Sequence, residues 1–279
     1  MEPTFSEFSY GFAVTNEFAG LLSLQIAPIF PSLLEEGKTG GGYDVKFDKP
    51  GLPLFLQFKR SDKMVRDTAR EYGLPGCSLS LPYHRFQITP SSKSRQHQLL
   101  LNLDTPKNRV YYVAPRFHRV QHLNDAWQAQ RVVARSLFLP PSSIGPMPDS
   151  GKHSIAFDGR SVWRCSEPTE IKGMGIEDVL IDLQEEVHSR KEPLRDEIAE
   201  WHARLDEARK DEFPLSGYEG PSAIEAVAPE QLPGPRDMPP MRSPKETDPT
   251  RLALQRVADR AQIEFDAQLF VVQEATRSS

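Results

Sequence analysis

The sequence predicts a mixed α/β (α+β) fold in which a central sheet is flanked by helices and followed by a helical C-terminal extension. Two observations predict it. Apolar residues recur at helical spacing near the start of the chain and again beyond residue 175. Between these regions lie short apolar runs bounded by Gly, Pro, Asn and Asp, which are typical of strands. Helices interleaved with such strands indicate a layered α/β domain.

The first predicted elements are a helix and a hairpin. Residues 14–24 carry apolar side chains at helical spacing. Two apolar runs follow at 42–47 and 54–59, and the DKPG sequence between them is typical of a turn. We therefore expect these two runs to pair as neighbouring antiparallel strands.

The region from 61 to 170 continues with alternating strands and helices. The predicted elements, in order, are an insertion at 61–92 that contains a strand at 83–88, a helix at 94–103, a strand at 109–113, a helix at 125–137, a Pro- and Ser-rich loop at 138–150, and a hairpin of strands at 153–157 and 161–165.

The C-terminal part is different in character. Residues 175–211 are highly charged, with apolar positions on one helical face, and Pro193 is expected to kink this helix or to start a second one. Residues 213–249 hold nine prolines and are predicted to be a linker. Helical spacing returns at 249–275. Its apolar stripe must pack back on the domain, pair with another copy or dock on a partner, because an isolated helix cannot bury it.

Composition limits the location of the protein. The chain has 279 residues, 38% of them hydrophobic, and only two cysteines, Cys77 and Cys165. This cysteine content fits a reducing compartment and indicates neither a disulfide scaffold nor a zinc site. No apolar run approaches about 18 residues, and the N-terminus lacks the pattern of a signal peptide. We therefore expect a cytoplasmic protein with no membrane contact.

The net charge of −5 hides an asymmetry along the chain. Residues 43–135 contain 16 Lys and Arg against 7 Asp and Glu, whereas residues 151–279 contain 17 against 26. A basic N-terminal half is what a protein that binds a phosphate backbone needs. The asymmetry predicts contact with nucleic acid.

Three polar residues on the predicted hairpin carry the chemistry. Asp44 lies on its first strand, and Gln57 and Lys59 lie on the second. Residues 57 and 59 are two apart, so both side chains face the same side of the sheet. Carboxylate and amide oxygens beside a lysine suit a hard metal ion and an activated water.

This pattern resembles the active site of the PD-(D/E)xK nuclease superfamily, and it is most similar to the Mrr-type branch, in which Gln replaces the second acid. The order of helix, strands, helix and strand over residues 8–115 can be aligned with the restriction-endonuclease-like core of that superfamily. The resemblance implies a nuclease domain at 1–170. The other predicted parts are a charged amphipathic helical segment at 171–212, the linker at 213–248 and a C-terminal amphipathic helix at 249–279.

The resemblance also implies roles for individual residues. Asp44, Gln57 and the backbone carbonyl of Phe58 would hold Mg²⁺ or Mn²⁺, and Lys59 would stabilise the attacked phosphate. A single carboxylate is little charge for a divalent cation, so we expect a second acid from the first helix. Glu17 is the predicted acid, with Glu7, Glu35 and Glu36 as competitors.

Five further residues are predicted to contact the nucleic acid. They are Lys63, Arg66, Arg85, Gln96 and Gln98. The basic residues would form a rim for phosphates, and the glutamines lie on the helix that would face the site. A solvated polar surface would account for the same residues without any function.

Two functions follow. In the first, the protein is an Mg²⁺-dependent endonuclease that acts on DNA rather than RNA, in anti-phage defence, with its C-terminal helices forming a homo-oligomer or binding a protein partner. In the second, the fold is the same but the site is catalytically silent, and the protein is a binding or scaffold subunit. Convergence of Asp44, Gln57, Lys59 and an acid would favour the enzyme.

Overall fold

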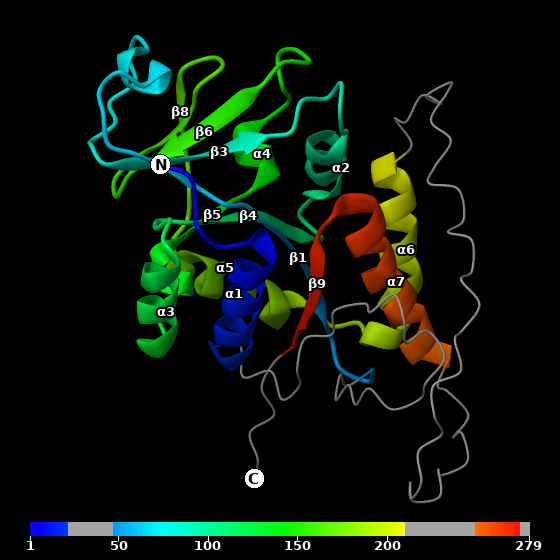
Figure 1. The fold of residues 1–279 in the computed structure, drawn as a ribbon. Coiled ribbons are helices and arrows are strands. Elements are labelled where there is room, and N and C mark those ends of the chain that lie inside the picture. Colours follow the sequence, from blue (N-terminus) through cyan, green and yellow to red (C-terminus); the bar gives the residue numbers. More distant parts are fainter. Residues whose placement is uncertain (22–46, 210–248, 274–279) are drawn as a thin grey trace, which may run out of the picture.

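The computed structural model describes residues 1–21, 47–209 and 249–273. It has a mixed α/β fold built from two sheets with helices packed around them (Figure 1). The helices of the described residues are α1 (Glu7–Leu21), α2 (Gln96–Leu103), α3 (Val120–Gln128), α4 (Pro141–Ile144), α5 (Ile176–Ser189), α6 (Leu194–Arg209) and α7 (Pro249–Phe265), with short 3₁₀ turns at Arg70–Gly73 and Val133–Arg135. The mixed α/β fold class predicted from the sequence is confirmed.

The first sheet has the strand order β5-β4-β1-β9. Its strands are β1 (Leu52–Phe58), β4 (Arg109–Pro115), β5 (Ser136–Leu139) and β9 (Gln268–Val272). Strand β1 is parallel to β4 and antiparallel to β9. Both hydrogen-bonding edges of β1 are thus occupied, so the predicted pairing of β1 with residues 42–47 is wrong. Strand β9, which is strongly apolar and comes from the far end of the described chain, pairs with one edge of β1.

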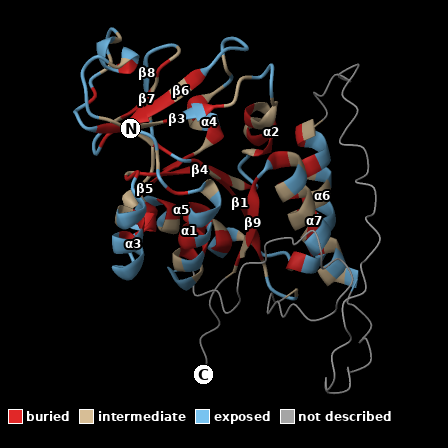
Figure 2. Ribbon diagram, viewed as in Figure 1, coloured by how far each residue is buried: buried red, intermediate tan, exposed pale blue. Residues whose placement is uncertain are grey.

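Helices cover both faces of this sheet. Phe55 and Tyr112 pack in one core with residues of α2, α6 and α7, whereas Leu54 and Leu56 pack in a second core with residues of α1 and α5. This alternation follows from the two-residue period of a strand. Figure 2 shows the buried strands between helices whose outer faces are exposed.

The second sheet is antiparallel, with the order β2-β3-β6-β7-β8. Its strands are β2 (Asp62–Met64), β3 (Tyr83–Ile88), β6 (His153–Phe157), β7 (Val162–Arg164) and β8 (Thr169–Ile171). The predicted strand at 83–88 and the predicted hairpin at 153–165 are both confirmed. The sheet lies beside the end of β1 that carries Lys59, and β2 follows that residue directly.

The C-terminal part packs back onto the first sheet. As predicted, Pro193 separates two helices, α5 and α6. Helix α7 buries Leu254, Val257 and Phe265 in the core that α6 and α2 share. The predicted helix at 249–275 instead ends at Phe265, because the β-branched and aromatic run after Ala267 forms β9. Homo-oligomer or partner contacts through these helices stay a prediction.

The region after β4 also differs from the prediction. The helix expected at 125–137 is α3, which ends at Gln128, and Gln130 has a positive φ of 51° that stops helical continuation. The chain then forms β5 and the short α4 where a loop at 138–150 was expected. The linker predicted at 213–248 lies outside the described residues.

Candidate active site

Two of the predicted site residues lie at the carboxyl end of β1. Gln57 is 1% exposed and Lys59 is 9% exposed. The Lys59 backbone N–H donates to the Val113 carbonyl at 2.9 Å, which extends the pairing with β4 beyond the strand itself. Gln57 and Lys59 face the same side as Phe55, toward α2, as their spacing predicts.

Gln96, the first residue of α2, joins these two side chains. The Lys59 ammonium donates to the Gln96 amide oxygen at 3.1 Å. The Gln96 amide nitrogen in turn donates to the Gln57 amide oxygen at 3.0 Å. Lys59 also lies over the ring of Tyr112, 5.8 Å from its centroid. Gln96 was predicted as a nucleic-acid contact, and the structure places it within the site.

Asp266 supplies a carboxylate from the turn between α7 and β9. Its Oδ2 accepts hydrogen bonds from the Gln96 amide nitrogen at 2.8 Å and from the Gln57 amide nitrogen at 3.2 Å. Asp266 has a positive φ of 51°, a conformation that favours Gly and Asn over most residues. The antiparallel pairing of β9 with β1 brings this turn to the end of β1.

Glu7 supplies a second carboxylate from the first turn of α1. Burial raises its pKa above the ordinary value, the Lys59 charge opposes that shift, and the Asp266 charge adds to it. Burial conversely lowers the pKa of Lys59, while the carboxylates of Glu7 and Asp266 oppose that change. The charges of Glu7 and Asp266 therefore both act on Lys59, which is buried, whereas Glu7 is half-buried and Asp266 is exposed. We call Glu7, Gln57, Lys59, Gln96 and Asp266 the Lys59 cluster.

A glycine on α1 allows this arrangement. A Cβ atom at Gly11 would lie 2.7 Å from the Phe58 ring, which is closer than side chains approach one another. The close contact holds the start of α1 against the end of β1. Glu7 lies one turn before Gly11 and is thereby held beside Lys59.

Of the other predicted acids, Glu17 does not join the cluster, and Glu35 and Glu36 lie outside the described residues. Glu17 lies ten residues after Glu7 on α1, about 15 Å further along the helix. Its carboxylate accepts a hydrogen bond from the Val132 backbone N–H at 2.6 Å, so Glu17 fixes the segment after α3 instead of a metal ion. The prediction of Glu17 in the site is wrong, and its competitor Glu7 occupies that place. Asp44 lies outside the described residues.

The remaining predicted residues lie around the cluster. The Phe58 carbonyl accepts a hydrogen bond from the Gln57 amide at 3.0 Å. Arg85 pairs with Glu71 at 2.7 Å and with Asp62 at 3.4 Å, which neutralises much of its charge. Gln98 donates to Asn102 within α2 at 2.8 Å. Lys63 lies on β2, and Arg66 is exposed in the segment after it.

The donor set suits a hard cation. In the described parts of the chain, no three Asp, Glu, His or Cys side chains are grouped so that they would hold a metal ion. The Gln96 amide nitrogen bonds both the Asp266 carboxylate and the Gln57 amide oxygen, however, and the charge of Asp266 acts on Glu7. Mg²⁺ commonly binds one or two carboxylates and keeps several waters. The raised pKa of Glu7 reflects in part the nearby negative charge of Asp266, which a cation would relieve.

Comparisons with known proteins add no assignment. No protein-family model, no curated protein and no solved structure matches the chain. Among the described residues, no helix is both long and apolar enough to cross a membrane. The candidate function therefore rests on the geometry of the Lys59 cluster and on the resemblance of its residues.

Proposed function

We propose that this protein is a metal-dependent nuclease that hydrolyses phosphodiester bonds in DNA at the Lys59 cluster. One observation carries the proposal: a buried lysine donates to Gln96, which also bonds Gln57 and Asp266, and the charges of Glu7 and Asp266 act on that lysine. Burying charged groups is unfavourable unless they are paired. Such an arrangement is a common mark of a functional site.

The residues divide the chemistry between them. Glu7, Asp266 and the Gln57 amide oxygen would hold Mg²⁺ or Mn²⁺. The bound ion would polarise the phosphate and lower the pKa of a coordinated water. Lys59 donates to a non-bridging oxygen of the phosphate and stabilises the charge that grows in the transition state. Gln96 orients Lys59 and Gln57 through its two hydrogen bonds.

A cleavage assay tests the proposal. The protein is incubated with plasmid, single-stranded DNA and RNA, in the presence of Mg²⁺, Mn²⁺ or EDTA, beside the Lys59→Ala variant. Lys107→Ala is the matched control, because Lys107 pairs with Glu200 on the surface away from the cluster. Cleavage that needs metal, disappears in Lys59→Ala and persists in Lys107→Ala supports the nuclease. Equal cleavage by both variants contradicts it.

One observation favours the silent subunit instead. The Gln57 and Gln96 amide nitrogens both donate to Oδ2 of Asp266, so this oxygen has partners within the protein. In this second function the protein binds a partner and cleaves nothing. Calorimetric titration with Mg²⁺ and Mn²⁺ distinguishes the two functions. Metal binding by the wild type that Asp266→Asn abolishes supports the enzyme. A wild type that binds neither ion supports the silent subunit.

A further inference from the structure

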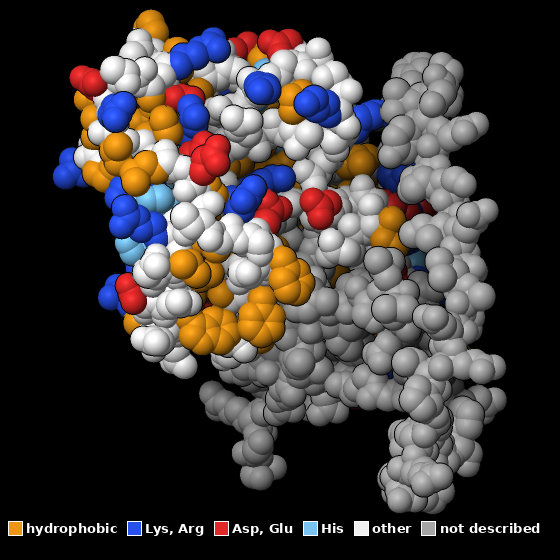
Figure 3. Space-filling model, in the orientation of Figure 1, with side chains coloured by type: hydrophobic (Ala, Val, Ile, Leu, Met, Phe, Trp, Pro, Cys, Tyr) orange, Lys and Arg blue, Asp and Glu red, His pale blue; other side chains and the backbone are white. Residues whose placement is uncertain are grey.

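Helix α1 exposes two phenylalanines on its solvent side. Phe8 is 70% exposed and Phe12 is 49% exposed, and they lie four residues apart on the same helical face. Trp127 of α3 is 39% exposed and stacks on Phe12, with ring centroids 5.8 Å apart and an interplanar angle of 19°. Figure 3 shows hydrophobic side chains gathered over α1 and α3.

The fold does not need these rings in its core. The opposite side of α1 already buries Tyr10, Val14 and Phe18 completely. The other two tryptophans, Trp163 and Trp201, are 7% and 1% exposed, so Trp127 is the accessible one. A surface of flat aromatic rings, unlike one of aliphatic chains, offers π faces to a planar ligand.

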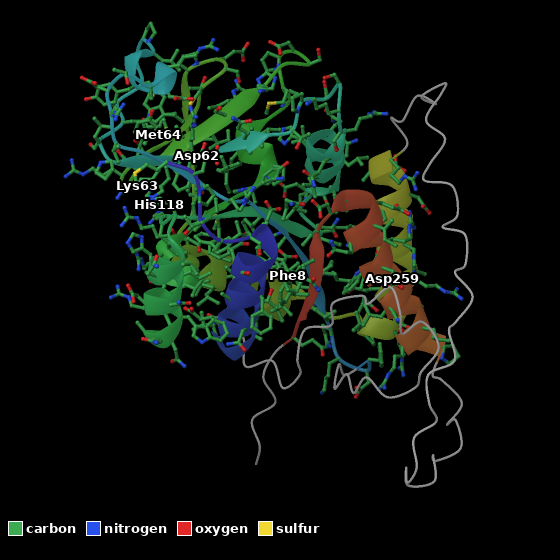
Figure 4. All side chains as sticks on the ribbon, in the orientation of Figure 1. Phe8, Asp62, Lys63, Met64, His118 and Asp259 are labelled. Carbon is green, nitrogen blue, oxygen red and sulfur yellow. The ribbon has the colours of Figure 1, made fainter. Side chains whose placement is uncertain are left out.

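One residue of this aromatic surface adjoins a member of the Lys59 cluster on α1. Phe8 directly follows Glu7, and it lies on the exposed side of α1 (Figure 4). Phe12 lies about 6 Å further along the helix. That distance is close to the rise of two nucleotides in one strand, about 3.4 Å each. A strand with a phosphate at Lys59 would therefore have its neighbouring bases over α1.

Two exposed cations lie next to segments that carry the aromatic surface. Arg60 follows Lys59, and its charge acts on Glu7. Arg131 follows α3, where its backbone N–H donates to the Ala126 carbonyl at 2.8 Å, and its side chain is exposed. Proteins bind single strands by combining aromatic side chains, on which bases stack, with basic side chains that contact phosphates.

We propose that Phe8, Phe12 and Trp127 form a stacking platform for unpaired bases of a single-stranded nucleic acid whose phosphate enters the Lys59 cluster. The position of the strand rests on the proposed function, whereas the stacking itself does not. A duplex hides its base faces, so the platform selects single-stranded or frayed ends over intact duplex.

Trp127 fluorescence tests the platform directly. In EDTA, which prevents cleavage, the protein is titrated with a single-stranded oligodeoxynucleotide of about 10 nucleotides, its duplex and an abasic strand of the same length. We expect the first to quench the fluorescence and the other two to bind at least about 10-fold more weakly. Equal affinity for the abasic strand, or binding of the single strand without quenching, would overturn the proposal.

Leucine variants separate stacking from general hydrophobic docking. Phe12→Leu and Trp127→Leu keep an apolar side chain but remove the ring. Each is expected to weaken single-strand binding about 10-fold, read from the anisotropy of a labelled oligonucleotide because Trp127→Leu removes the fluorophore. Ile263→Ala on α7, where Ile263 is 75% exposed, is the matched control and should bind normally. Binding unchanged in both leucine variants would contradict the platform.

Two other outcomes bear on the proposal. In the first outcome, the wild type self-associates, both leucine variants abolish this association, and oligonucleotide binding does not change. This result would assign the surface to a second copy of the chain and would overturn the stacking platform. The assay measures binding in EDTA and so does not depend on cleavage. Quenching without any nuclease activity would contradict the proposed function but not the stacking platform. Metal-dependent cleavage without quenching would contradict the stacking platform but not the proposed function.

Discussion

The side-chain nitrogen of Gln96 lies 2.8 Å from the Asp266 carboxylate, although 170 residues separate the two in the sequence. The same nitrogen lies 3.0 Å from the Gln57 amide oxygen. Gln96 thus connects the central strand to the C-terminal α7–β9 unit. The cluster is complete only when this unit packs against the sheet, so its assembly depends on tertiary structure far from the motif.

The two glutamates of α1 should behave differently. We expect Glu7→Gln to lower metal-dependent cleavage by about 100-fold or more, since it removes a carboxylate from the proposed cation site. Glu17→Gln on the same helix is the matched control. Its amide oxygen still accepts the Val132 N–H, so activity should persist and stability should change by less than about 1 kcal/mol. Equal losses of activity in both would contradict the assignment of Glu7.

Asp266→Asn should separate activity from stability. Asn tolerates a positive φ better than Asp does and still offers an oxygen to Gln96, so the melting temperature should stay constant or rise. Cleavage should fall by about 100-fold, because the charge is lost. Asp259→Asn, two turns earlier on α7 (Figure 4), is the control and should retain activity. A large fall in melting temperature for Asp266→Asn would indicate a structural role instead.

Cleavage should show an acidic limb above pH 4.5. Burial raises the pKa of Glu7, so its carboxylate is protonated at a higher pH than an exposed glutamate. As the pH falls through this raised pKa, Glu7 loses its charge and the site loses cation affinity. The measurement is kcat/KM against pH at subsaturating Mg²⁺. A rate that stays constant down to pH 4.5 would exclude Glu7 as a ligand.

His84 should make the fold sensitive to acid. Burial, together with Lys63, His118, Arg116 and Arg135, lowers the pKa of His84 to about 4, and its Nε2 atom is buried with no hydrogen-bond partner in the structure. In the unfolded chain this histidine is protonated near pH 6.5. The contribution of neutral His84 to the free energy of unfolding is therefore fully present above pH 6.5 and is lost as the pH falls toward 4. The lowered pKa of His84 corresponds to about 3 kcal/mol in the free energy of unfolding.

Urea unfolding at pH 7 and pH 4 measures this contribution. The wild type should lose more stability over this range than His84→Phe, in which the titrating group is absent. The comparison uses the difference between the two pH values in each protein, so a constant effect of the added ring volume cancels. An equal loss in both proteins would mean that other groups cause the acid sensitivity.

Local pattern predicted most of the helices and strands but not their partners. The spacing at 94–103 and 109–113 correctly predicted α2 and β4, and Pro193 correctly predicted the break between α5 and α6. The hairpin at 42–59 failed because the apolar residues of β9 pair with β1 from the far end of the chain. Such pairing leaves no signal near β1 itself.

The site was predictable to a similar extent. The spacing of Gln57 and Lys59 correctly placed both on one face of β1, and Gln96 was singled out on α2. The choice between Glu7 and Glu17 depended on where α1 begins, which periodicity determines poorly. Nothing around Asp266 distinguishes it from other acids of a charged helix. Only the turn into β9, which was predicted as helix, brings it to Lys59.

The β9 strand also protects the protein from association with itself. It covers an edge of β1, whose residues Leu52, Leu54 and Leu56 are fully buried. Without β9, that edge would present a row of unpaired N–H and C=O groups beside an apolar sequence, which is a template for strand addition from another chain. Removal of the C-terminal α7–β9 unit would therefore do more than take Asp266 out of the Lys59 cluster. It would turn the central strand into a starting point for aggregation.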